Sequence, residues 1–231
     1  MPLIEHPVFR AMRGDESDPD LVLDIGPDGK DRSRSGLNMT SVGGAVLGAE
    51  SGVELNGTSA YLLNSTAHFR SADATGTIVA WVKRTVAGAT HRVFSSSDQG
   101  TTSYYLFIEL AAANQLRILQ RSGGTANEIR GETALTSLQY HQLVCVGTGA
   151  AYVLYVDGVP EALTVVNGAN LGYWFSSTAN RDNVVVGGLQ HTSLSSPFNG
   201  SIPNVRVYSR ILSADEIREE YLRVVPRGLR T

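Results

Sequence analysis

The stretch "FNGSIPNVRVYSRILSADEI", residues 198–217, decides the fold of this chain. Its first part contains the pair Asn199-Gly200, which favours a tight turn between strands. Val205 and Val207 follow at alternating positions, so the sequence predicts a short strand that directs both valines toward the core. The stretch is therefore expected to supply the last strand of a strand-rich protein.

The same stretch ends in a predicted helix. Ser213 and Glu216 stand three residues apart, the spacing of a capping box in which each side chain bonds to the backbone N–H of the other. Ile217, Tyr221 and Leu222 then fall on one face of that helix. Because a one-sided apolar stripe needs a surface to cover, we expect the helix to dock on the body of the domain.

The composition indicates one globular domain of mostly β structure. A chain of 231 residues is long enough to bury a substantial core, and all-β sandwiches of this length form a single unit. Glycine is frequent, with 24 residues, while charged residues make up only 18% of the chain. This balance favours strands joined by tight turns over helices.

The charge and the cysteine content exclude several classes of function. The formal net charge is -3 and no long basic run occurs, so no nucleic-acid partner is expected. Cys145 is the one cysteine, which excludes an intrachain disulfide, and its apolar neighbours predict a buried side chain. No stretch approaches the roughly 20 apolar residues that a membrane-spanning helix needs, so no membrane partner is expected.

Several segments have the pattern of strands joined by turns. "TIVAWVKR" (77–84) is apolar on both faces, as expected of a central strand. "SYYLFIEL" and "QLRILQR" flank "AAAN" and predict a hairpin. Asp157-Gly158 predicts a second hairpin, because a type I′ turn needs a positive φ at both central residues. Strands at this spacing, with few helices, predict an antiparallel sandwich or jelly roll.

The order of the segments carries a family resemblance. The segments are "GVELNGTSAYL" (52–62), "GTIVAWVKR" (76–84), "SLQYHQLVCVG" (137–147), "YVLYVDGVP" (152–160), "VVVGG" (184–188) and the closing stretch at 198–217. In this order they resemble the laminin G-like, concanavalin A-like lectin/glucanase β-sandwich family, in its bacterial and phage-associated branch. The resemblance implies an all-β fold, an antiparallel β-sandwich of jelly-roll type with one short C-terminal helix, over residues 21–222.

The chain departs from this family at two places. Tyr140 stands where the family often has a tryptophan, and Ile202-Pro203-Asn204 stands where it often has an acidic pair after the closing glycine. Without those acids the family's expectation of a calcium site loses its support, so we predict no metal and no cofactor. Pro203 also predicts an edge or a bulge, because proline cannot donate a ladder hydrogen bond.

The sequence contains no constellation typical of an enzyme. A retaining glycoside hydrolase needs two carboxylates about 5 Å apart, which on a strand means acids at alternating positions. No E-x-D-x-x-E pattern occurs, and Glu216, Glu219 and Glu220 are placed on the predicted helix as a solvated face. The five histidines lack the spacing of a zinc site. We therefore expect no enzyme, and glycoside hydrolase is kept as a remote alternative.

The loop "NGANLGYWFSSTANRDN" (167–183) holds the candidate ligand-binding residues. An aromatic face on a loop can stack on a sugar ring while neighbouring polar side chains supply hydrogen bonds. The candidates are Tyr173, Trp174, Asn180, Arg181 and Asp182. In the alternative interpretation the aromatic triple, which includes Phe175, plugs one end of the sandwich and exposes only an edge. Both interpretations stay open at this point.

Two terminal segments differ from the rest of the chain. Residues 1–20 carry apolar side chains without helical or strand period, and we interpret them as an extended arm that packs on its own domain or docks on a neighbour. The docking candidates are Leu3, Ile4, Val8, Phe9 and Met12. Residues 223–231 form a basic C-terminal tail. The start lacks a basic n-region and a long apolar h-region, so we expect no signal peptide.

These observations lead to two hypotheses about function. A laminin G-like fold usually serves outside a cell, yet this chain shows no export signal. The leading hypothesis is therefore a non-enzymatic structural protein on a virion surface, a capsid decoration or head-associated protein made in the host cytoplasm. Its expected partners are copies of itself, with a trimer as the expected assembly, and capsid or other virion proteins bound through the arm. The alternative is a lectin-like carbohydrate-binding module with a glycan partner.

Overall fold

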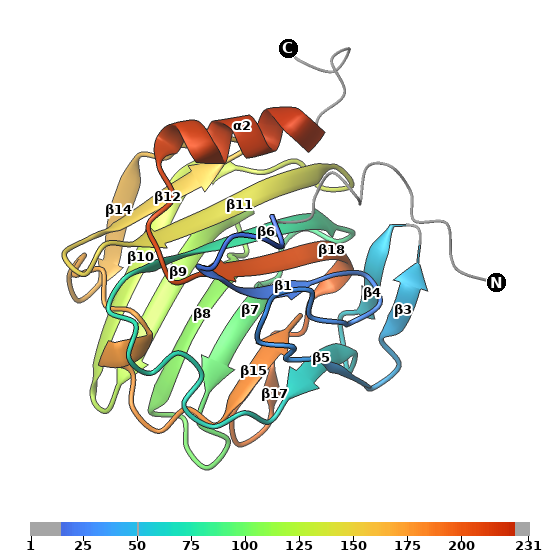
Figure 1. The fold of residues 1–231 in the computed structure, drawn as a ribbon, viewed down its shortest axis with the longest axis horizontal. Helices are drawn as coiled ribbons and strands as arrows, with labels where there is room; N and C mark the ends of the chain where they lie inside the picture. Colours follow the sequence, from blue (N-terminus) through green and yellow to red (C-terminus); the bar gives the residue numbers. More distant parts are fainter. Residues whose placement is uncertain (1–14, 50, 225–231) are drawn as a thin grey trace.

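A computed structural model describes residues 15–49 and 51–224, which form two antiparallel β-sheets packed face to face with a helix on the outside (Figure 1). The apolar core fills the space between the sheets. The predicted all-β sandwich with one C-terminal α-helix is confirmed for these residues. The predicted division at residues 20 and 222 stays a prediction.

The first sheet has eight strands and is built around one long strand, β18 (Asn199–Tyr208). β18 pairs with one neighbour along nearly its whole length. On its other side it pairs with one strand along its first half and with another along its second half. In order across the sheet, the other strands are β13 (Val159–Pro160), β12 (Tyr152–Val156), β11 (Tyr140–Gly147), β6 (Gly76–Arg84), then beyond β18 the strands β4 (Gly52–Asn56) and β3 (Val46–Ala49), with β1 (Leu21–Ile25) also paired to β18.

The second sheet also has eight strands, and a small two-stranded hairpin lies beside it. In order, its strands are β14 (Leu163–Asn167), β10 (Thr125–Ala134), β9 (Gln115–Ser122), β8 (Tyr104–Leu110), β7 (His91–Ser97), β15 (Asn183–Val186), β5 (Tyr61–Asn64) and β2 (Thr40–Val42). The hairpin consists of β16 (Leu189–Gln190) and β17 (Leu194–Ser195), and a 3₁₀ turn, η1, spans Phe175–Ser177. The predicted pairing of β8 with β9 is confirmed.

Strand β18 follows the predicted pattern along its second half. Val205 and Val207 are fully buried in the core between the sheets, as expected from their alternation. Pro203 lies at a bulge, where the pairing of β18 with β6 shifts register between Ser201 and Asn204. A bulge tolerates proline because the extra residue makes no ladder hydrogen bond.

The beginning of β18 corrects one prediction. Asn199 and Gly200 do not form a turn, because both residues already belong to the strand. A Cβ atom at Gly200 would lie 2.1 Å from the carbonyl oxygen of Lys83 on β6, and Gly200 has a φ of +139°. Glycine is therefore required here by the close approach of two strands rather than by a turn.

Helix α2 (Ala214–Val224) lies across the outer face of the first sheet (Figure 1). The predicted capping box is confirmed: the Ser213 N–H donates to Glu216 Oε2 at 2.7 Å, and the Glu216 N–H donates to Ser213 Oγ at 3.2 Å. Ile217 is fully buried, and the ring of Tyr221 stacks on Trp81 of β6 with the centroids 5.9 Å apart. The helix therefore docks on the domain through the face that the sequence predicted.

A buried ion pair joins α2 to β18. Arg206 is 0% exposed, and its guanidinium pairs with Glu220 of α2. The Nε of Arg206 donates to Asn204 Oδ1 at 2.8 Å, and its Nη1 donates to the Tyr208 hydroxyl at 3.3 Å. The Asn204 amide donates in turn to Asp24 Oδ1 at 2.6 Å. Because a buried charge is costly unless it is paired and hydrogen-bonded, the sheet and the helix depend on each other here.

His141 binds the turn at Asp157-Gly158, which also contacts α2. His141 Nδ1 lies 2.7 Å from Asp157 Oδ2, and its Nε2 lies 3.0 Å from the carbonyl oxygen of Thr136. Both partners are acceptors, so both ring nitrogens donate and the charged imidazolium fits the site. Burial opposes that charge, but the hydrogen bond and charge of Asp157 prevail and raise the pKa of His141. Gly158, the next residue of the predicted hairpin turn, packs against Tyr221.

The Arg206–Glu220 pair gives a stability prediction. Replacing Arg206 by Met is expected to lower the free energy of unfolding by about 3–5 kcal/mol, because Glu220 is left buried without its counter-charge. The double variant Arg206→Met/Glu220→Leu removes both charges and is expected to recover most of that loss. Urea unfolding measures both effects.

The matched control is Glu219→Gln, on the exposed side of the same helix, which is expected to change stability by less than about 0.5 kcal/mol. A double variant as unstable as Arg206→Met alone would contradict the dependence of the helix on this pair.

The His141 pair gives a pH prediction. The pKa of His141 is higher in the folded chain than its ordinary value of 6.5. The pair therefore stabilises the fold fully below about pH 6.5, and this contribution is lost as the pH rises through the folded-state pKa. In His141→Gln that loss is expected to disappear.

Urea unfolding of both proteins between about pH 5 and pH 9 checks this expectation. Burial and the charge of Arg84 lower the pKa of His91 to about 4, so its effect on stability has the opposite sign. Because both proteins contain His91, the difference between them isolates His141. A difference that stays constant across the range would rule out the charged pair.

Candidate functional site

A pocket of about 500 Å³ lies between α2, the end of β18 and residues 15–18. Its lining is mostly charged, and we call it the α2 pocket. It is lined by Asp15, Asp18, Arg206, Tyr208, Arg210, Leu212, Glu216, Glu219, Glu220 and Arg223. Its volume is within the range of pockets that bind small ligands.

The floor of the α2 pocket comes from the outward positions of β18. Arg206 and Tyr208 alternate with the buried valines of that strand, so both side chains point away from the core and toward α2. The ion pair of Arg206 with Glu220 fixes the charged groups at the floor. Leu212, which is 4% exposed, adds an apolar side.

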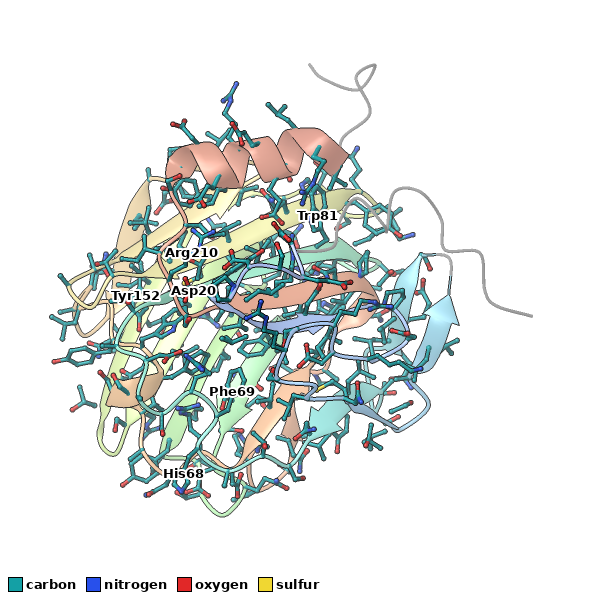
Figure 2. The ribbon with its side chains drawn as sticks, viewed as in Figure 1. Asp20, His68, Phe69, Trp81, Tyr152 and Arg210 are labelled. Atoms are coloured by element: carbon teal, nitrogen blue, oxygen red, sulfur yellow. The ribbon has the colours of Figure 1, made fainter. Side chains whose placement is uncertain are left out.

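Arg210 connects the two walls of the pocket. Its Nη2 donates to Asp18 Oδ2 at 2.9 Å, and its Nη1 lies 2.7 Å from Glu216 Oε1 on α2. The backbone beside it is also tied down, because the Ser209 N–H donates to the carbonyl oxygen of Asp20 at 2.8 Å. Figure 2 shows Asp20 and Arg210 next to each other at the first sheet. The segment before β1 is thus held against the segment after β18.

Two carboxylates of the pocket, Glu216 and Asp15, have lowered pKa values. Burial alone would raise the pKa of Glu216, but the hydrogen bonds from Ser213 and the Arg210 guanidinium lower it. Hydrogen bonds from the Ser17 hydroxyl and N–H lower the pKa of Asp15. The general acid of a glycoside hydrolase needs a raised pKa, which is the opposite shift. Ionised carboxylates and guanidinium groups instead offer fixed acceptors and donors for hydrogen bonds.

The structure buries two of the five residues predicted to bind a ligand, and the first is Trp174. It is 0% exposed, and a Cβ atom at Gly76 or Gly147 would come within 2.5 or 2.2 Å of its indole ring. Phe175 is also 0% exposed, whereas Tyr173 is 39% exposed. A buried indole cannot stack on a sugar at the surface, so Trp174 is corrected to a core residue. The aromatic segment has the arrangement of a plug at one end of the sandwich.

Arg181 is the second correction. It is 1% exposed, and its guanidinium donates to the carbonyl oxygens of Thr178 at 3.0 Å and Phe175 at 2.9 Å. Its Nη1 donates to Ser96 Oγ at 2.8 Å. All three nitrogens therefore hold the loop in place, and none is directed to a ligand.

The remaining candidates of this loop lie nearer the surface. Asn180 is exposed, and Asp182 Oδ1 accepts a backbone hydrogen bond of 3.0 Å. Among the described residues, no hydrogen bond joins Tyr173 to either of them. His68, whose N–H donates to the Arg181 carbonyl at 2.8 Å, lies at the opposite end of the molecule from α2 in Figure 2. The part of the loop around Arg181 therefore lies far from α2, and no residue of the loop lines the α2 pocket.

The sequence-based prediction misses the residues of the α2 pocket. It names neither Arg206 nor Arg210, and it places Glu216 and Glu220 on a solvated helix face, although Glu220 is 8% exposed. One signal was present, because Arg206 sits among the core residues of a central strand and needs a counter-charge to cover it. The identity of that counter-charge depends on how α2 docks, which residue spacing does not reveal.

No metal site is found in the described part of the chain. Among residues 15–49 and 51–224, no group of three or more His, Cys, Asp or Glu side chains is arranged to hold a metal ion. Where the family often has acids, Asn204 directs its amide Nδ2 to Asp24 Oδ1 at 2.6 Å and to the Ile25 carbonyl at 3.1 Å. Calcium takes oxygen ligands, so an N–H donor at this position does not fit a calcium site.

Part of the predicted arm can be placed. Residues 15–20 pack on their own domain through Asp18 and Asp20. The predicted docking residues lie outside the described residues: Leu3, Ile4, Val8, Phe9 and Met12. Most of the predicted basic tail, residues 225–231, lies outside them too. Within the described residues, no helix has the length and apolar character needed to cross a membrane.

Solved structures with the same fold include carbohydrate-binding and sialidase proteins. The CBM40 domain of Ruminococcus gnavus IT-sialidase, bound to α2,3-sialyllactose, matches with a TM-score of 0.58 at 21% identity, over 65% of this chain and 84% of that one. The sialidase of Trypanosoma rangeli matches with a TM-score of 0.62 at 20% identity, over 88% of this chain but 32% of that one. At these identities the likeness establishes the fold alone.

A comparison with curated proteins finds no match. The family model described as the concanavalin A-like lectin/glucanases superfamily matches residues 56–218, which include most of both sheets and the start of α2. The matched segment contains the floor of the α2 pocket, with Arg206 and Tyr208, together with Arg210 and Glu216 on its walls. This chain belongs to the concanavalin A-like lectin/glucanase superfamily.

Proposed function

We propose that this protein is a lectin-like carbohydrate-binding module that holds a glycan in the α2 pocket without cleaving it. The observation that carries the proposal is the pocket itself, whose lining combines five carboxylates with three guanidinium groups around a volume of about 500 Å³. Sugar hydroxyls both donate and accept hydrogen bonds, so a surface that offers both kinds of partner at close range suits them.

The pocket is organised before any ligand arrives. Arg210 is held between Asp18 and Glu216, and Arg206 is held by Glu220. Ordering of side chains is one of the main costs of binding, and a site whose side chains are already ordered avoids part of that cost. The ring of Tyr208, 5.7 Å from the Arg210 guanidinium, adds an aromatic edge at the floor.

The comparisons support the lectin-like interpretation over the virion hypothesis. Two structural neighbours are CBM40 domains bound to α2,3- or α2,6-sialyllactose, so this sandwich accommodates glycan binding in other proteins. The virion hypothesis rests on the arm, whose docking residues lie outside the described residues, and it stays a prediction. The lowered pKa values of Glu216 and Asp15 support binding without hydrolysis.

A glycan array followed by calorimetric titration of the best glycan tests the proposal. In Arg210→Gln the two walls lose their bridge, and the affinity is expected to fall at least about tenfold, which corresponds to about 1.4 kcal/mol. Tyr173→Ala, on the separate loop at the plugged end, is the matched control and is expected to bind like the wild type. The urea midpoint of each variant shows whether the fold is retained.

Three results would count against the proposal. Absence of binding to any glycan would reject the lectin-like function. Loss of binding in Tyr173→Ala with full binding in Arg210→Gln would move the site to the loop at 167–183. Release of reducing sugar from the bound glycan would show an enzyme, and the pocket would then need a different assignment.

A further inference from the structure

We propose that the α2 pocket selects its glycan by charge and that its ligand is a saccharide with a free, protonated amino group. This inference rests on the proposed function and names the class of sugar that the site takes. It differs from what the sialyllactose-bound structural neighbours would suggest, because sialyllactose carries a carboxylate.

The charge balance of the pocket is the first argument. Its lining has five carboxylates against three guanidinium groups, which leaves a formal charge of −2. A cleft with an excess of one sign of charge attracts ligands of the opposite sign and repels those of the same sign. The pocket therefore favours a cation and disfavours the carboxylate of a sialic acid.

The engagement of the guanidinium groups is the second argument. Arg206 uses its nitrogens on Asn204, Tyr208 and Glu220. Arg210 is shared between Asp18 and Glu216. Asp15, whose pKa is lowered mainly by hydrogen bonds from Ser17, also feels the positive charge of Arg223.

An anionic sugar would therefore have to compete with a carboxylate of the protein for a guanidinium that is already in an ion pair. That exchange would leave a carboxylate beside the ligand without its counter-charge, which is costly at a partly buried site.

The acceptors of the rim are the third argument. Glu219 is exposed on α2, and Asp15 is exposed on the facing wall. Each carboxylate has about four sites for accepting hydrogen bonds, and an ammonium group donates three. An amine placed between these walls finds several charged acceptors, and hydrogen bonds between charged groups are the strong ones.

The position of these residues in the chain separates this pocket from the family match. The family model covers residues 56–218, so Asp15, Asp18, Glu219, Glu220 and Arg223 lie outside it. Four of these five residues are acidic. The negative charge of the pocket is thus supplied largely by segments that membership of the superfamily does not specify.

Calorimetric titration with two matched pairs of sugars tests the inference. The first pair is an oligomer of glucosamine and the same oligomer fully N-acetylated, and the second pair is sialyllactose and lactose. At about pH 6, the free-amine oligomer is expected to bind at least about tenfold more tightly than the acetylated one, because only the free amine can carry a positive charge. Sialyllactose is expected to bind more weakly than lactose.

Charge-removing variants locate the effect. Asp15→Asn/Glu219→Gln keeps the shape of the rim but removes two charges, so the preference for the free amine is expected to fall below about threefold. Glu132→Gln, which removes one carboxylate charge on β10 of the second sheet, is the control and is expected to keep the full preference.

The outcomes distinguish this inference from the proposed function. Binding of the free-amine and acetylated oligomers within about twofold of each other, or tighter binding of sialyllactose than of lactose, would overturn the selection by charge and leave the lectin-like function standing. A preference that persists unchanged in Asp15→Asn/Glu219→Gln would also overturn it. Absence of binding to all four sugars and to a glycan array would reject the proposed function itself.

Discussion

A guanidinium that is fully buried on the outer face of a central strand constrains the rest of this structure. Arg206 cannot face water or an apolar surface, so a carboxylate has to be brought over it, and Glu220 on α2 supplies that carboxylate. The helix is thereby required to lie along the sheet at one place. Its capping box and the stacking of Tyr221 on Trp81 then define where it begins and how it is rotated. The α2 pocket forms at the margin of this contact.

The closed end of the sandwich and the α2 pocket on its outer face are built by different interactions. At one end the indole of Trp174 fills the space between the sheets, and Arg181 fastens the loop over it with bonds to neutral oxygens. Such an end is closed and apolar inside. Beside α2, by contrast, charged side chains from three separate segments meet around open volume. Apolar packing thus determines the position of the aromatic loop, while ion pairs determine the arrangement of the side chains that line the pocket.

Much of the fold could be predicted from local patterns, because alternation and capping act over a few residues. Val205, Val207 and the Ser213–Glu216 box occupy the positions that their spacing indicates. The prediction fails where a distant neighbour decides the outcome. Gly200 serves the close approach of Lys83 rather than a turn, and Trp174 is buried because Gly76 and Gly147 leave room for its ring. The pocket could not be predicted for the same reason, since Asp18 and Arg210 are 192 residues apart.

The contacts of Arg210 with Asp18 and Glu216 join the chain segment that precedes β1 to the segment that follows β18. Local opening of a domain commonly starts from its ends, where few contacts hold the chain. Here the chain segment before β1 and the segment after β18 both line a single cavity, so a ligand bound in it would contact both segments. Binding of a ligand in this cavity would then raise the free energy of local unfolding of both segments. Conversely, unfolding of either segment would lower the affinity for the ligand.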